Sequence, residues 1–373
     1  MRFPEFSGEW KNTSLGKIGK TFNGLTGKSG ADFGRGFPYI TYKSIFDDSK
    51  IDISRVEYVE ITDVERKKET QNEVQYGDVF FTTSSETPDE VGMSSVLLDE
   101  IKDCYLNSFC FGYRLNSLSK TIPDYMRFYL RSQTIRKKMF VLAQGSTRFN
   151  ISKSEVMGIS INIPETKEQR KIANLLTLLD ERIATQNKII DKLQSLIKGI
   201  AQNIVSNNKP NIRLSDCLDC SSSTLQESDV CETGIYPVYG ANGIVGYLDN
   251  YNTEGEAVYI IKDGSGVGTV SYATGKCSAT GTLNTLQAKD GYSLQYLYYI
   301  LKVFNFEPYK TGMAIPHIYF KDYGKAKIFC PSYTEQLRYA RLQSAIDSKL
   351  SVEKNILTSL SSQKQYLLRQ MFI

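Results

Sequence analysis

Apolar residues at heptad spacing mark two long segments of the chain. Residues 167–205 contain no proline and a single glycine, and their apolar side chains recur at a and d positions. Such a narrow stripe suits packing against one other helix. These positions are Leu176, Leu179, Ile183, Ile190, Leu193, Ile197, Ile200 and Ile204 in this segment, and Ile346, Leu350, Leu357, Leu360, Leu367 and Met371 in the second. We predict two paired helices of about 38 residues, each ~57 Å long. The alternative is two amphipathic helices that each pack on their own domain.

One position of the stripe is polar in both segments. Gln186 interrupts the first stripe, and Glu353 interrupts the second at the same register. A polar side chain at such a position costs stability but fixes the register and the choice of partner. The sequence therefore favours mutual pairing of the two helices.

A shift of 167 residues aligns the two halves of the chain without a gap. The aligned halves share the frame G-x5-I-x12-P-x3-E-Q, which leads into each predicted helix. Residues 13–19 and 212–218 form a fainter echo at the start of each half. The chain therefore consists of two diverged copies of one repeat. The identical pairs include Gly145 with Gly312, Ile151 with Ile318, Ile161 with Ile328, Pro164 with Pro331, Glu168 with Glu335, Gln169 with Gln336, Asp180 with Asp347 and Leu193 with Leu360.

The segments between the helices predict mixed, strand-rich domains. Short β-branched and aromatic runs bounded by Gly, Asp and Ser predict strands within 57–62, 77–84, 108–115, 256–275 and 282–288. Residues 123–143 and 293–304 predict helices between strands, and the polar segment 206–211 is a candidate linker. We expect an α/β (α+β) fold with a first domain at 1–164, a central helix at 165–205, a second domain at 206–331 and a C-terminal helix at 332–373. The two strand-rich domains would be separated by two antiparallel coiled-coil helices, related by a pseudo-twofold internal repeat.

Composition agrees with a cytoplasmic globular protein. The 373 residues exceed the usual size of one domain, and 41% of them are hydrophobic against 23% charged. The N-terminus lacks the apolar region of a signal peptide, and nowhere do about 18 apolar residues run together. Seven scattered cysteines fit a reducing compartment, and the net charge of +4 is only a mild bias toward acidic partners.

Several motifs resemble catalytic or metal sites only superficially. Residues 22–29 lack the first glycine of a phosphate-binding loop, because Phe22 stands in its place. The glycine-rich segment 264–268 precedes a strand-like run and not a helix, and Cys217 and Cys220 form a single C-x-x-C with only Cys231 nearby. With one histidine in the chain, His317, we expect no catalysis and no metal site in this protein.

The repeat resembles a known family. Two variable domains that alternate with two helices, and the stretch from Ile161 through Pro164 and Gln169 to Ile183, closely resemble the specificity subunits of type I restriction-modification systems. Residues 236–272 also look like one common version of their recognition domains. The resemblance covers essentially the whole chain. The second copy departs from the pattern at Tyr339, which replaces the aliphatic Ile172.

The resemblance implies a DNA-recognition role. Each domain would read one half of a split, asymmetric site in double-stranded DNA, and the helices would set the spacer between the halves. Two methyltransferase subunits would dock on the helices and methylate adenine with S-adenosylmethionine. Restriction and translocase subunits would use ATP and Mg²⁺ to cut unmethylated DNA, so this chain would need no cofactor. The alternatives are a stand-alone DNA-binding protein and a coiled-coil adaptor built from the same domains.

Polar loops supply the candidate DNA contacts in the first domain. Arg148 would take guanine and Asn150 adenine, because their side chains match those base edges. The other reading for each candidate is a turn or a contact between domain and helix. The candidates in segments 41–43, 82–86 and 144–150 are Tyr42, Lys43, Thr83, Ser84, Ser85, Arg148 and Asn150.

The second domain supplies a parallel set. The shift of 167 residues places His317 at the position of Asn150, which motivates both choices. The candidates in segments 239–243, 262–266 and 310–317 are Asn242, Lys262, Ser265, Lys310 and His317. Residues 131–140 are also basic, with Arg131, Arg136, Lys137 and Lys138, and predict either a solvated helix face or phosphate contacts.

Overall fold

The chain folds into two compact units, each of which contains parts of both long helices. The computed structural model describes residues 2–69, 72–312 and 314–372. Unit 1 consists of Met1–Ala184 and Thr358–Ile373, and unit 2 of Thr185–Leu357. The sequence-based division at 164/165, 205/206 and 331/332 treats each helix as a separate body. The compact units instead cut each helix in two.

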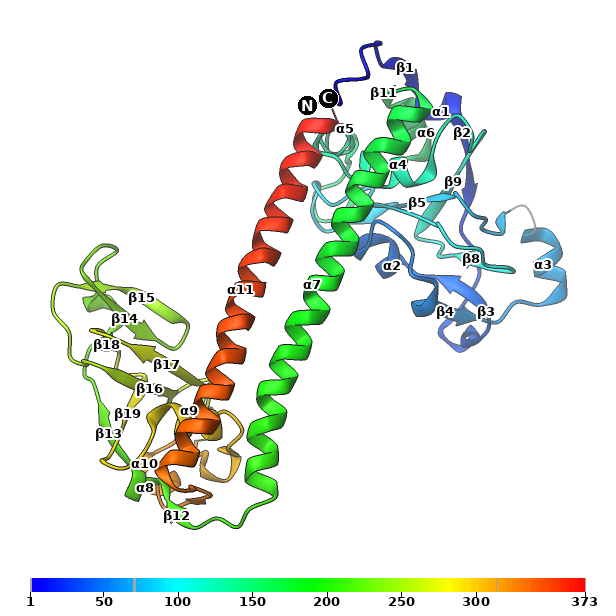
Figure 1. The fold of residues 1–373 in the computed structure, drawn as a ribbon. Coiled ribbons are helices and arrows are strands. Elements are labelled where there is room, and N and C mark those ends of the chain that lie inside the picture. The colour runs from blue at the N-terminus through cyan, green and yellow to red at the C-terminus, as the bar shows by residue number, and fades with distance from the viewer. Residues whose placement is uncertain (1, 70–71, 313, 373) are drawn as a thin grey trace. The chain divides into compact units, whose positions relative to one another are not determined.

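The two long helices are α7, Thr166–Ser206, and α11, Tyr333–Met371 (Figure 1). Their bounds lie within a residue or two of those predicted from the heptad pattern. In unit 1, Asp180 of α7 forms an ion pair with Lys364 of α11. In unit 2, Gln186 contacts Glu353, and Gln343 donates a hydrogen bond to the Ile197 carbonyl at 3.2 Å. As the residue number rises along α7, the number of the contacting residue on α11 falls, so the two helices run antiparallel.

A repeated glutamine joins the start of each long helix to its domain. Gln169 accepts a hydrogen bond from the Ile122 amide at 2.9 Å and donates one to the Pro164 carbonyl at 2.9 Å. Gln336 accepts from the Ser293 amide at 2.9 Å and donates to the Pro331 carbonyl at 2.9 Å. Both side chains are buried. The buried amide satisfies backbone groups that would otherwise be unpaired at the domain–helix junction, which accounts for the Gln in the repeated frame.

In unit 1 the domain is built on a four-stranded antiparallel sheet in the order β2-β9-β5-β7. A three-stranded sheet, β4-β3-β8, includes one parallel pair, and two-stranded pairs join β1 to β11 and β10 to β6. Helices α1, α4, α5 and α6 contribute to the core together with α7. The elements are β1 Lys11–Ser14, α1 Leu15–Ile18, β2 Gly19–Asn23, η1 Gly30–Asp32, β3 Phe33–Ile40, α2 Tyr42–Asp47, η2 Ile53–Arg55, β4 Glu57–Val59, α3 Asp63–Glu69, β5 Val79–Thr82, β6 Ser84–Ser85, β7 Ser94–Val96, β8 Tyr105–Leu106, β9 Cys110–Leu115, α4 Pro123–Tyr129, α5 Gln133–Leu142, β10 Phe149–Asn150, α6 Lys153–Gly158 and β11 Ser160–Ile163.

Unit 2 repeats this topology. Its four-stranded sheet has the order β13-β19-β16-β17, its three-stranded sheet is β15-β14-β18 with a parallel pair, and β12 pairs with β20. Helix α9 packs in the same core as α8 and the end of α7. The elements are β12 Ile212–Arg213, α8 Leu214–Cys217, β13 Leu218–Ser222, η4 Glu227–Asp229, β14 Tyr236–Gly240, β15 Gly243–Leu248, β16 Glu256–Ile261, β17 Val270–Thr274, β18 Ser278–Ala279, β19 Leu283–Ala288, α9 Leu294–Leu301, η5 Glu307–Tyr309, α10 Phe320–Tyr323 and β20 Lys327–Ile328.

The end of each long helix packs on the domain of the other repeat copy. Phe372, just beyond α11, lies against the rings of Tyr125 and Tyr129 of unit 1, with ring centroids 5.7 and 5.6 Å apart. The Thr134 hydroxyl donates a hydrogen bond to the Phe372 carbonyl at 2.9 Å. In unit 2, Ile204 near the end of α7 is buried in the domain core. Each core is therefore completed by a helix from the other copy.

On both helices, most positions of the predicted apolar stripe pack in hydrophobic clusters. Leu176, Leu179, Leu360 and Leu367 pack in the core of unit 1, and Ile190, Leu193, Ile197, Ile346, Leu350 and Leu357 form a cluster in unit 2. Ile183 is half-buried and lies outside both clusters. Within the described residues, no helix combines the length and the apolar character needed to cross a membrane.

The polar position within the apolar stripe joins the two repeat copies. Gln186 Nε2 donates hydrogen bonds to the Glu353 carboxylate and, at 3.0 Å, to the Glu353 carbonyl. Lys349 forms an ion pair with the same carboxylate. Because Gln186 and Glu353 are equivalent under the 167-residue shift, each contacts its own repeat partner. This contact marks the local twofold axis of the helix pair.

Candidate nucleic-acid interface

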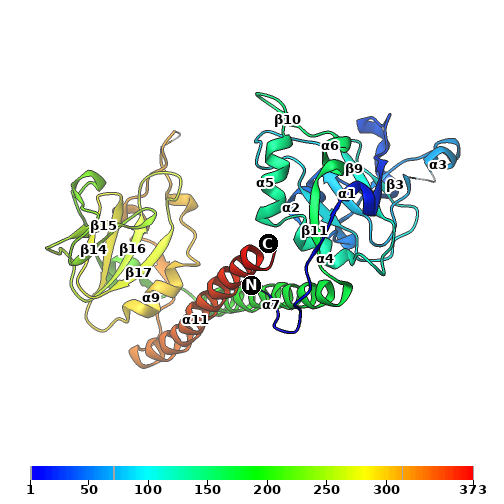
Figure 2. The same cartoon turned by 90° about the horizontal axis from the view of Figure 1, so that it is seen from above.

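A hairpin loop at residues 144–150, which ends in strand β10, projects from unit 1 (Figure 2). The Gln144 amide donates to the Asn150 carbonyl at 2.9 Å, and the Asn150 amide donates to the Gln144 carbonyl at 2.8 Å. Gly145 has a φ of 138°, and a Cβ there would collide with the Arg148 carbonyl oxygen. Only glycine is readily accommodated at this turn. The loop 144–150 is therefore a defined turn that carries Arg148 at its tip.

Unit 2 contains the same loop at 311–317. The Thr311 amide donates to the His317 carbonyl at 2.9 Å, and the His317 amide donates to the Thr311 carbonyl at 2.7 Å. Gly312 has a φ of 88°, and a Cβ there would collide with the Ile315 carbonyl oxygen. Met313, which belongs to the predicted segment 310–317, lies outside the described residues. The repeated glycine of the sequence frame thus closes the same turn in both units.

Each hairpin loop is anchored to the loop that follows a central sheet strand. The Ile151 amide donates to the Thr83 carbonyl, just after β5, at 2.9 Å. The Ile318 amide donates to the Lys262 carbonyl, just after β16, at 2.9 Å. The structure therefore brings together segments 82–86 and 144–150 in unit 1, and segments 262–266 and 310–317 in unit 2. Each of these four segments is a separate candidate for DNA contact in the sequence.

The hairpin loop of unit 1 borders a polar cavity of about 700 Å³. Tyr42 stacks on Phe46 with ring centroids 5.9 Å apart, and its hydroxyl donates to the Ser84 carbonyl at 2.6 Å. Burial raises the pKa of Tyr42 above its ordinary value, so its hydroxyl stays protonated. The cavity is lined by Tyr42, Phe46, Ser84, Ser85, Glu86, Glu90, Thr147 and Arg148. Phe46 and Glu90 were missed in the sequence. Phe46 reaches the cavity only through the long-range packing of α2, and Glu90 through the loop after β6, where it accepts a hydrogen bond from Ser85.

Several candidate side chains are occupied within their own unit. Ser84 is buried in β6, and the Ser85 hydroxyl donates to Glu90 at 3.2 Å. The Thr83 hydroxyl donates to the Phe109 carbonyl at 2.7 Å. In unit 2, Lys310 forms an ion pair with Glu307 at 2.6 Å, and His317 Nδ1 lies 2.6 Å from Asp263 Oδ1. These contacts position the loops before any ligand arrives.

Other candidates present their side chains at the surface. Arg148 and Asn150 are exposed, and the Arg148 guanidinium has no hydrogen bond or ion pair to the described residues. Asn242 lies at the exposed tip of the β14–β15 hairpin, and Ser265 is also exposed, while Lys262 is half-buried. Lys43 is exposed on α2 and borders a separate cavity with Asp47, Asp48 and Asp52. The structure therefore does not bring Lys43 to the hairpin loop.

The prediction for Arg131 and Arg136 was wrong. Both side chains are half-buried and bind backbone carbonyls, so they do not form a free, solvated helix face. Arg131 donates to the carbonyls of Ser94, Ile45, Phe46, Asp47 and Asp48, and Arg136 to those of Asp89, Val91 and Gly92. Burial lowers the pKa of Arg131 to about 10 and also lowers that of Arg136. The Arg131 guanidinium therefore holds the C-terminal end of α2, and the Arg136 guanidinium holds the loop before β7.

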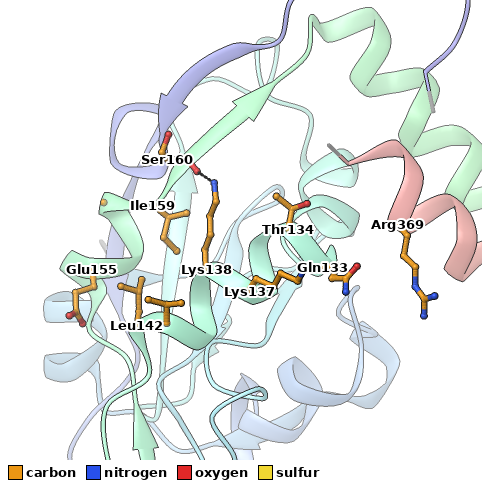
Figure 3. Close-up of a pocket in the computed structure, with 11 residues that line it drawn as sticks. Gln133, Thr134, Lys137, Lys138, Leu142, Glu155, Ile159, Ser160 and Arg369 are labelled. Carbon is orange, nitrogen blue, oxygen red and sulfur yellow. Dashed lines mark hydrogen bonds between the residues drawn. The ribbon is translucent and has the colours of Figure 1, made fainter.

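Lys137 and Lys138 lie elsewhere on the same helix, beside a cavity of about 790 Å³ (Figure 3). Lys138 donates to the Ser160 carbonyl at 2.5 Å, and Arg369 of α11 borders the same cavity. Leu142 and Ile159 supply apolar lining, while Glu155 is acidic. Apart from Lys137 and Lys138, none of the candidate DNA contacts lines this cavity.

The motifs that resembled catalytic or metal sites in the sequence lie in ordinary strands, helices and loops. Residues 264–268 connect β16 to β17, and no helix follows them. Residues 22–29 continue from β2 into a loop. Cys217 lies in α8 and Cys220 in β13, and in the described part of the chain no three His, Cys, Asp or Glu side chains group as metal ligands.

The family model of the type I restriction modification DNA specificity domain matches residues 7–195 and again residues 210–362. The two matches coincide with the two repeat copies and together cover most of the chain. The chain belongs to the type I restriction-modification DNA specificity domain family. The specificity domains therefore correspond to the two repeated folds, each with its hairpin loop and long helix.

Two relatives carry the same family name. The chain is 28% identical over 203 residues to a putative type I restriction enzyme specificity subunit of Methanocaldococcus jannaschii, over 54% of this chain and 46% of that protein. It therefore spans less than half the length of that relative. It is 26% identical over 296 residues to a putative type I specificity subunit of Mycoplasma genitalium, over 71% of this chain and 76% of the relative.

Solved structures show the same specificity-subunit fold. The crystal structure of a type I restriction-modification S subunit from M. genitalium has a TM-score of 0.68 at 17% identity, over 100% of this chain and 99% of that chain. A chain from a structural study of complex assembly and conformational transition in a type I restriction-modification system has a TM-score of 0.56 at 17% identity, over 99% and 98%.

Proposed function

We propose that this chain is the DNA-specificity subunit of a type I restriction-modification complex, and that each unit reads one half of a bipartite, asymmetric DNA site. The observation that supports this proposal is the repeated hairpin loop. In each unit the loop is anchored after the equivalent sheet strand, β5 or β16, and is closed by equivalent backbone hydrogen bonds, yet the side chains on the two loops differ. One scaffold with two different sets of side chains suits the reading of two different half-sites.

The long helices would supply the spacer and the partner surface. A rigid antiparallel pair can hold two DNA-binding modules at a fixed separation, as recognition of two half-sites requires. We propose that two methyltransferase subunits dock on the helices and methylate adenine with S-adenosylmethionine. Restriction and translocase subunits would use ATP and Mg²⁺. The chain itself would contribute recognition and no catalysis.

The test is single-molecule methylome sequencing of a host that carries this gene with a methyltransferase partner gene, and of the same host without this gene. We expect a split, asymmetric, adenine-methylated motif that disappears with the gene. Unchanged methylation, with both proteins expressed, would contradict the proposal. A stand-alone DNA-binding protein would then still show a steep salt dependence of DNA affinity, whereas a coiled-coil adaptor would bind no DNA.

A further inference from the structure

The tips of the two hairpin loops carry different chemistry at one equivalent position. The 167-residue shift that aligns Gly145 with Gly312 also aligns Arg148 with Ile315. In both loops, a Cβ on the glycine would collide with the carbonyl oxygen of this tip residue. The backbone at Arg148 and the backbone at Ile315 therefore occupy the same place in the same turn.

Ile315 is presented to solvent by a braced loop. Its side chain is 59% exposed. On the C-terminal side, the Ile318 amide donates to the Lys262 carbonyl at 2.9 Å, and the Pro316 carbonyl accepts from the Gly264 amide at 3.0 Å. The His317–Asp263 contact adds a side-chain tie. A single exposed isoleucine is ordinary on a protein surface, but this one occupies the place that an exposed arginine occupies in unit 1.

The two side chains match different base edges in the major groove. Arginine can donate two hydrogen bonds to O6 and N7 of guanine. An apolar side chain can instead contact the C5 methyl group, which only thymine presents among the four bases. Isoleucine has no polar group with which to read any other edge.

We infer that Ile315 reads the C5 methyl group of a thymine in the half-site bound by unit 2, at the place where Arg148 contacts guanine in the other half-site. This inference rests on the proposed function, and it adds that these loops enter the major groove. It assigns a specificity determinant to Ile315, whereas Lys310 and His317 on the same segment hold the loop in shape.

The test removes single methyl groups from the DNA. The full chain, in complex with its methyltransferase subunits, is titrated at fixed salt with duplexes that carry the methylated motif. In each duplex, one thymine of the motif is replaced by deoxyuridine. We expect one replacement to weaken binding about fourfold, the factor that one buried methyl group provides. The Ile315→Ala variant should bind the thymine and deoxyuridine duplexes equally at that position.

Two further variants sharpen the result. Ile315→Arg should shift the preference at that position from thymine to guanine. Arg148→Ala is the matched control, and it should keep the thymine–deoxyuridine ratio of the unmodified chain. A motif that contains no sensitive thymine, or an Ile315→Ala variant that keeps the fourfold ratio, would overturn the inference and leave the proposed function intact. A complex that binds no specific sequence would overturn both.

Discussion

Arginines of similar appearance in the sequence have opposite roles in the structure. Arg131 and Arg136 are enclosed by backbone carbonyls, whereas Arg148 stands exposed on a hairpin loop beside a polar cavity. The basic run 131–140 therefore stabilises the domain through its arginines, whereas the less conspicuous Arg148 is exposed and remains our candidate for a DNA contact. Substitutions at the two kinds of site should be separable by experiment.

Arg148→Ala should relax recognition at one position of one half-site and leave the other half-site unchanged. A bidentate arginine–guanine contact contributes about 1–3 kcal/mol of discrimination, so the preference at that position should fall by about 5- to 150-fold. The methylome of a host carrying the variant measures this directly. A uniform loss of affinity for all sequences would instead identify Arg148 as a phosphate contact.

Arg136→Ala should lower stability and leave the letters of the DNA motif unchanged. Its guanidinium donates to three carbonyls at 2.6–2.9 Å. Removing a charged donor from such acceptors costs about 3 kcal/mol, measured as the free energy of unfolding in denaturant. Arg136→Lys should retain only part of the stability that Arg136→Ala loses, because an ammonium group cannot span the same three carbonyl acceptors. A changed motif without loss of stability would refute this role.

At the scale of single elements, the heptad stripe was the most informative local signal. It predicted both ends of α7 to within one residue. The apolar stripe repeats along a single helix, so it can be recognised without information on distant contacts. The sequence frame also selected the glycine of the hairpin loops and the glutamine of the helix junctions. The sequence did not reveal that α2 places Phe46 beside β6, or that carbonyls surround Arg131, since both depend on residues far apart in the chain.

The Gln186–Glu353 contact should make the helix pair sensitive to acid. The ion pair with Lys349 and the hydrogen bond from Gln186 hold the pKa of Glu353 below its ordinary value of 4.5. The stabilisation is therefore complete above about pH 4.5 and is lost as the pH falls through the lowered pKa. We expect the thermal midpoint to fall less between pH 5 and pH 3 in the Gln186→Leu/Glu353→Leu double variant than in the unmodified chain.

The same double variant tests whether the polar pair costs stability. Apolar side chains in place of a buried polar or charged pair are often neutral or stabilising, so the midpoint at pH 7 should stay the same or rise by a few degrees. Gln186→Leu alone should lower it, because the Glu353 carboxylate then loses its amide partner. Equal pH dependence in the double variant and the unmodified chain would contradict the assigned role of this contact.

At the scale of the whole molecule, the length of the helix pair should set the unread spacer of the DNA site. Seven residues inserted after Gln186 and seven before Glu353 would lie opposite each other, because the helices are antiparallel, and would preserve the heptad register and the Gln186–Glu353 contact. Each helix would lengthen by ~10 Å, about the length of two or three base pairs. The methylome should show a longer spacer between unchanged half-sites.

An insertion after Gln186 alone is the control for the paired insertion. It leaves the seven added residues without a partner in α11, so the thermal midpoint should fall. Half-site letters that change in the paired variant, or a spacer that keeps its original length, would argue against the helices as a ruler.

The docking of residues 358–372 on unit 1 makes the core of the first domain depend on residues that follow the whole of unit 2 in the chain. Tyr125 and Tyr129 meet Phe372 only after all of unit 2 has left the ribosome. A frameshift or premature stop within the second copy would therefore leave an apolar surface uncovered on the first. Such a product would be prone to aggregation and proteolysis. The fold would thus disfavour the accumulation of fragments that contain the first domain without the second.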